Sequence, residues 1–220
     1  MGYTTAPVLK TGWATGPMPL RAERSARRIV LGALDSLAMH GVIFTSFRDY
    51  LVAAHGPATA SAVFEAEPEY LLSQAYPDES LGRLVALASA RTGLEADEIV
   101  FEFGVFTAEI SFARLYPAFF DSSPSARDFL LTVETRIHEL VRETIPNAGP
   151  PHLDISPNGG GGISIVYASP RRLCVLLRGL TEGASRHYGE HAEMNERTCM
   201  LRGDLACAFD VSFNAGSPSA

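Results

Sequence analysis

The hydrophobic period of this chain changes at residues 147–151, which read Asn-Ala-Gly-Pro-Pro. Before this segment, apolar residues recur at helical spacing; after it, they alternate in short runs bounded by glycine, as in strands. A proline pair ends the preceding helix, because proline lacks the amide hydrogen that a helix interior uses. The sequence therefore predicts an α+β fold, with a helical N-terminal subdomain packed on a C-terminal subdomain that holds a small antiparallel sheet and long helices.

In the first half, every element expected between residues 42 and 145 is a helix. The last of these should begin with Ser123 as N-cap and Pro124 as first helical residue. One face of that helix would carry an apolar stripe, made of Leu130, Val133, Ile137, Val141 and Thr144. Earlier helices are expected near 58–66, 79–92 and 96–116.

In the second half, the run Asn158-Gly-Gly-Gly-Gly162 predicts a hairpin turn. We expect strands at 153–155 and 163–167, a helix over 171–187, and strands near 192–202 and 205–213. Residues 1–38 are expected to be an N-terminal extension, a flexible tail followed by a helix over 22–38, and residues 214–220 a disordered tail. Residues 39–213 would then form one domain.

Charge excludes some classes of partner. The 220 residues include 18 Lys and Arg against 25 Asp and Glu, a formal net charge of −7. Such an acidic chain is unsuited to nucleic acid or to an anionic membrane surface. No apolar run is long enough to span a bilayer, and the apolar segment at 29–34 is too short for a signal peptide. We expect a cytoplasmic protein.

His138 is the histidine best placed for chemistry. It lies inside the predicted helix that ends at 145 and borders the apolar stripe, next to Ile137 and Val141. Such an imidazole either hydrogen-bonds a neighbouring carbonyl or presents Nε2 to a metal. The helix pattern alone leaves both readings open.

Tyr167, Ser169 and Arg171 form a second pattern. On an extended strand, alternate residues point to one face, so two hydroxyls and a guanidinium would be aimed at one place. These groups suit a carboxylate or phosphate, which arginine binds through two parallel hydrogen bonds. A polar outer face of a strand would show the same pattern.

Together these motifs resemble the haem nitric oxide/oxygen binding (H-NOX) family, which includes the haem domain of soluble guanylate cyclase and bacterial sensors. Pro150-Pro151 follow His138 by twelve and thirteen residues, and the Tyr-x-Ser-x-Arg motif begins twenty-nine residues after it. The resemblance runs from about 39 to 213 and also covers three short segments: Met39-His-Gly-Val-Ile-Phe44, Phe103-Gly104 and Gly179-Leu-Thr-Glu-Gly183.

The resemblance implies roles for individual residues. His138 would be the iron ligand of a haem b held between the two subdomains. Tyr167, Ser169 and Arg171 would bind its propionates, and Ile43 and Pro151 would press on the macrocycle.

It also implies which gas is bound. Relatives that hold O₂ stably carry a tyrosine nine residues after the first tyrosine of the motif, where this chain has Leu176. The other matching distal positions are Phe47 and Thr107. O₂ on haem needs a hydrogen-bond donor more than NO or CO does. We therefore expect a nitric oxide sensor that can also take CO and that holds little or no O₂.

The three cysteines suggest a second site. Some bacterial relatives bind a structural zinc at the positions of Cys174, Cys199 and Cys207, with a fourth ligand that would here be Glu196 or His191. The alternatives are three thiols packed as small apolar groups, or a haem-independent zinc or thiol redox sensor.

We do not expect an enzyme, because the sequence has no nucleophile elbow, no phosphate loop and no paired carboxylates. The resemblance implies signalling in trans, to a protein such as a histidine kinase or a cyclic-di-GMP enzyme.

Overall fold

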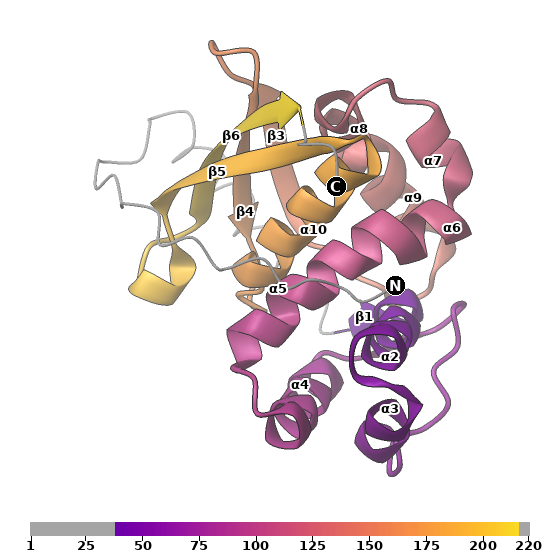
Figure 1. Cartoon of the computed structure of the whole chain (residues 1–220). Coiled ribbons are helices and arrows are strands. Elements are labelled where there is room, and N and C mark those ends of the chain that lie inside the picture. The colour runs from indigo at the N-terminus through magenta and orange to yellow at the C-terminus, as the bar shows by residue number, and fades with distance from the viewer. Residues whose placement is uncertain (1–37, 216–220) are drawn as a thin grey trace.

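The computed structural model describes residues 38–215. Two groups of elements meet along two crossing helices, with α2, α3 and α4 at one end, the larger sheet at the other, and α5 and α10 between them (Figure 1). This confirms the predicted α+β fold with a helical first half and a small antiparallel sheet in the second. The N-terminal tail, nearly all of the helix expected over 22–38 and the last five residues lie outside the described part of the chain.

The first half is mainly helical. Its elements are β1 (Ala38–His40), α2 (Gly41–His55), α3 (Pro57–Val63), β2 (Ala75–Pro77), α4 (Glu79–Thr92), α5 (Ala96–Phe106), the π-helical segment η2 (Thr107–Phe112), α6 (Ala113–Leu115), α7 (Pro117–Asp121), α8 (Ala126–Thr132), a second π-helical segment η3 (Val133–His138) and α9 (Glu139–Thr144).

Two expectations for this half were wrong in detail. Residues 38–40 pair with 75–77 as a two-stranded antiparallel sheet, where only helices were expected after residue 42. The helix that ends near 145 starts later than expected, because Ser125 rather than Ser123 is its N-cap. The Ser125 hydroxyl accepts a hydrogen bond from the amide of Asp128 at 3.1 Å.

The second half holds a four-stranded antiparallel sheet in the order β3-β4-β6-β5. Its elements are β3 (His152–Pro157), β4 (Ile163–Ala168), α10 (Cys174–His187), β5 (Glu190–Thr198), the short 3₁₀ helix η4 (Met200–Arg202) and β6 (Cys207–Ala215). The predicted hairpin is present, and Asn158 closes it by accepting hydrogen bonds from the amides of Gly160 and Gly162 through Oδ1. None of the helices among residues 38–215 is both long and apolar enough to cross a bilayer.

Helices α5 and α10 cross with almost no space between their backbones. A Cβ added to Gly104 would meet Gly179 Cα at 2.9 Å, and one added to Gly179 or Gly183 would strike a carbonyl oxygen of α5. Glycine is required where two backbones approach this closely. The two glycine-containing segments singled out in the sequence therefore meet at this crossing, which fixes how the helical half sits on the sheet half.

Candidate functional site

A cavity of about 360 Å³ lies where the two halves meet, within the range of pockets that hold small molecules. One wall is the helix run α8–η3–α9, and every residue of the predicted apolar stripe lines it: Leu130, Val133, Ile137, Val141 and Thr144. Other walls come from α2, α10 and strands β3 and β4, through side chains that include Val42, Leu177, Leu180, Leu153 and Ile165. The interior is thus mainly apolar.

His138 lies on this wall, at the end of η3, with 17% of its side chain exposed. Its ring contacts Glu134 through Nδ1, with 2.9 Å between Nδ1 and Oε2. With Nδ1 engaged in this way, Nε2 is the ring nitrogen left for a metal.

Glu134 was not singled out from the sequence, although its place one helical turn before His138 could have indicated the contact. Its carboxylate also accepts a hydrogen bond from the amide of Leu153 at 3.0 Å and one from Arg142 at 2.8 Å. Burial alone would raise the pKa of Glu134. The hydrogen bond from His138, followed by the charge of His138, the hydrogen bond from the Leu153 amide and the charge of Arg142, lowers that pKa to about 2.

Tyr167 and Arg171 both line the cavity, and Ser169 lies beside them, buried. The expectation that all three share one strand face was wrong, because β4 ends at Ala168. Ser169 begins a turn in which its hydroxyl accepts a hydrogen bond from the amide of Arg171 at 3.3 Å. Arg171 therefore reaches the cavity from a turn, whereas Tyr167 reaches it from β4.

Each of these side chains has protein partners. The Tyr167 hydroxyl accepts a hydrogen bond from the amide of Leu173 at 3.0 Å, and burial raises the pKa of Tyr167 to about 12. The Arg171 guanidinium donates to the carbonyls of Gly149 at 2.5 Å and Ala38 at 3.0 Å, and pairs with Asp78, whose Oδ2 lies 2.7 Å from Nε. Asp78 was not foreseen as a partner of this group.

The remaining predicted residues are divided between the cavity and the core. Ile43, Pro151 and Leu176 line the cavity. Phe47 is fully buried and does not line the cavity; it packs edge to face on Phe103, with ring centroids 4.9 Å apart. Thr107 is also fully buried and does not line the cavity.

Thr181 is a cavity residue that the sequence reasoning missed. It is fully buried, and its hydroxyl has no hydrogen-bond partner among the described residues. It lies on α10, about one turn beyond Leu176 and Leu177.

The residues present fit a haem. The cavity supplies an apolar envelope for a flat ring, an imidazole with Nε2 left for iron, and a phenol and a guanidinium for carboxylates. Ile43 and Pro151 are placed among the apolar contacts of such a ring.

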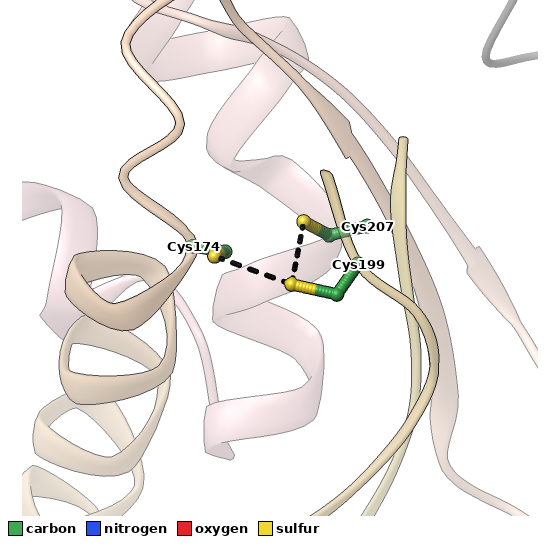
Figure 2. Close-up of side chains that lie close together, drawn as sticks. All are labelled: Cys174, Cys199 and Cys207. Carbon is green, nitrogen blue, oxygen red and sulfur yellow. Dashed lines mark hydrogen bonds between the residues drawn. The ribbon is translucent and has the colours of Figure 1, made fainter. Parts of the chain in front are cut away.

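The three cysteines gather at a separate place (Figure 2). All are buried, and their sulfur atoms lie within 4.8 Å of one another, with Cys199 Sγ 3.8 Å from Cys174 Sγ and 3.9 Å from Cys207 Sγ. The hydrogen bond from Cys207 holds the pKa of Cys174 at about 6, whereas burial raises that of Cys199. Neither predicted fourth ligand joins this group: Glu196 pairs with Arg202, and His191 pairs with Glu182 at 3.0 Å.

The sequence and the fold were each compared with those of known proteins. The sequence matches the model of the family described as Haem-NO-binding over residues 40–196. The fold is similar to that of an H-NOX protein from S. oneidensis in the Fe(II)NO ligation state, with a TM-score of 0.74 and 24% identity, covering 80% of this chain and 99% of that one.

An Fe(II) unliganded H-NOX protein from K. algicida is similar at a TM-score of 0.69 and 20% identity, covering 83% of this chain and 100% of that one. No curated protein matched the sequence. At these identities the solved structures show a shared fold, while the family match spans well over half of the chain. The chain belongs to the haem-NO-binding (H-NOX) family.

Proposed function

We propose that this protein is a nitric oxide sensor that carries haem b, with His138 as the iron ligand and Tyr167, Ser169 and Arg171 at the propionates. The H-NOX fold is a haem-based gas-sensor fold. The observation that carries the proposal is the apolar cavity that is lined by the His138 imidazole and also by Tyr167 and Arg171. When bound, the haem supplies the iron atom to which a gas ligand attaches.

The cavity side of α10 supports a preference for NO. Leu176, Leu177 and Leu180 line the cavity there and offer no hydrogen bond. O₂ draws negative charge from iron and is retained when a donor stabilises that charge, whereas NO and CO depend on a donor much less. Thr181 adds one hydroxyl to this wall, a weaker donor than the phenol of a tyrosine at position 176 would be.

The proposed output is a movement of the helix that carries His138. The carboxylate of Glu134 contacts both His138 and the amide of Leu153 in β3. A shift of the imidazole would therefore displace Glu134 and, through it, strand β3. A signalling protein in trans, such as a histidine kinase or a cyclic-di-GMP enzyme, would read the altered surface.

The haem assignment is tested by His138→Gly. Purified protein should show a Soret band that this variant loses and that added imidazole restores, because imidazole can enter the space left by the side chain. His187→Gly is the matched control, since His187 is exposed on the last turn of α10 and does not line the cavity. A wild-type protein that stays colourless after haem is supplied would contradict the proposal. The preference for NO would be contradicted if reduced protein kept a stable oxygen-dependent spectrum in air.

A second candidate function uses the three thiols. Three buried sulfurs within 4.8 Å, one with a lowered pKa, support either a structural zinc or a thiol redox sensor that needs no haem. In that case the purified protein would contain zinc or respond to oxidants with the cavity empty of haem.

A further inference from the structure

The hydrogen bond between Glu134 and His138 differs from an ordinary pair on a helix surface. The two residues lie one turn apart across η3, with 2.9 Å between Oε2 and Nδ1. Their side chains are only 19% and 17% exposed. Exposed pairs at this spacing are worth a few tenths of a kcal/mol and are readily broken by water and salt. Burial keeps water and salt ions away from the contact between Glu134 and His138, so the hydrogen bond holds one geometry.

Three further groups fix the carboxylate. The amide of Leu153 lies 3.0 Å from Oε2, Arg142 Nη2 lies 2.8 Å from Oε1, and His152 Nδ1 lies 3.2 Å from Oε1. Both oxygens are therefore held, and the side chain cannot rotate away from His138 without losing contacts on η3, α9 and β3 at once.

An acceptor at Nδ1 has a known effect on an imidazole that binds a metal. A carboxylate that accepts the Nδ1 proton fixes the tautomer, orients the ring and increases electron donation from Nε2. We propose that Glu134 is a positioning residue that orients His138, strengthens its bond to iron and ties it to strand β3. This inference rests on the proposed function, because it requires that His138 bind haem iron.

The same carboxylate connects His138 to the sheet. Besides contacting Glu134, Arg142 donates a hydrogen bond to the carbonyl of Pro151 at 3.2 Å, next to the start of β3. A displacement of His138 must either break its bond to Glu134 or carry Glu134 along, which strains the contacts with Leu153 and His152. Glu134 is thus placed to resist loss of the iron bond and to pass movement of His138 to β3.

The test uses the haem-loaded protein with Glu134→Gln. Glutamine keeps the size of the side chain and removes the charge, so Nε2 becomes a weaker donor. We expect the iron–histidine stretching band of the reduced, gas-free protein to move to lower frequency in resonance Raman spectra, and the haem reduction potential to rise. Haem retention should fall by about tenfold, the lower end of the effect seen when such supporting residues are changed.

Glu143→Gln is the matched control, because it makes the same substitution at an exposed position on the adjoining helix α9 and should leave all three readouts unchanged. A Glu134→Gln protein that binds haem with the wild-type stretching band and potential would overturn the inference while leaving the proposed function intact. A wild-type protein that takes up no haem would instead overturn the proposed function.

A second variant covers the case in which Glu134→Gln fails to fold. Arg142→Met removes a cation that competes with His138 for the same carboxylate. We expect the stretching band to move to higher frequency, opposite to the effect of Glu134→Gln. A general loosening of the helix would lower the band in both variants, so a lower band in Arg142→Met would contradict electron donation through Glu134.

Discussion

Arg171 Nε lies 2.7 Å from Asp78 Oδ2, in an ion pair whose side chains are 9% and 17% exposed. The pair joins the turn after β4 to the residue that precedes α4. Arg171 is also the residue proposed to bind a haem propionate. Asp78 and a propionate are both carboxylates, so they compete for one guanidinium.

This competition predicts opposite effects of Asp78→Asn on stability and on haem binding. In the haem-free variant, Arg171 would lose its buried anionic partner, and the free energy of unfolding should fall by about 2 kcal/mol. This is less than the cost of a fully broken buried pair, because two backbone carbonyls still accept hydrogen bonds from Arg171. Haem affinity should rise, since the propionate no longer displaces a carboxylate. Urea unfolding and haem transfer to apomyoglobin measure the two quantities.

The control is Asp49→Asn, which breaks the exposed pair between Asp49 and Arg114, with side chains 47% and 64% exposed. It should change the free energy of unfolding by less than about 1 kcal/mol and leave haem affinity unchanged. If haem affinity fell together with stability in Asp78→Asn, Asp78 would be supporting the propionate site rather than competing with it.

Leu176→Tyr should increase oxygen retention. The substitution places a phenol hydroxyl on the cavity wall, where a hydrogen bond of about 1.4 kcal/mol would slow oxygen dissociation about tenfold. Leu176→Phe is the control, because it adds the same ring without a donor and carries the same cost of a larger side chain. Stopped-flow release of oxygen from reduced protein distinguishes them. Equal rates in the two variants would show that the hydroxyl does not reach the ligand.

Much of the fold could be predicted from local patterns in the sequence. The change of period at residues 147–151 separates the helical half from the sheet, and the stripe from Leu130 to Thr144 forms one wall of the cavity. Both features depend on periodicity within one element. The pairing of β1 with β2 could not be foreseen, because a three-residue strand has no measurable period and its partner is more than thirty residues away.

The site was predictable only in part, because the sequence pattern gives positions within one element and not the contacts between distant elements. His138 and Leu176 reach the cavity because of their helical positions. The partners that fix the site come from distant elements: Asp78 precedes α4 yet pairs with Arg171, and Leu153 in β3 donates to Glu134. The proposed distal roles of Phe47 and Thr107 depend on side-chain packing, and both side chains are buried without lining the cavity.

Glu134 should make the haem-free protein sensitive to acid. Its pKa is lowered from 4.5 to about 2 in the folded protein, so the folded state binds this proton less readily than the unfolded chain does. The resulting stability is present above pH 4.5 and is lost as the pH falls toward 2. Because the group is partly solvated, we expect about 1 to 2 kcal/mol rather than the full value of the shift.

Glu134→Gln should therefore flatten the dependence of the free energy of unfolding on pH over this interval, measured by urea titration at several pH values. Glu143→Gln, at an exposed position on the adjoining helix α9, should keep the wild-type slope. A wild-type slope in Glu134→Gln would mean that the contacts with His138 and Arg142 add no net stability.

Cys199 is the central member of the thiol group, since its sulfur lies 3.8 Å from that of Cys174 and 3.9 Å from that of Cys207. If the group holds zinc, purified protein should contain about one zinc per chain by mass spectrometry. The Cys199→Ser protein should lose this zinc and part of its thermal stability, because a structural zinc contributes directly to folding. The haem spectrum serves as the internal control, since none of the three cysteines lines the cavity. Zinc-free wild-type protein would instead identify the three cysteines as apolar packing between α10 and the last hairpin.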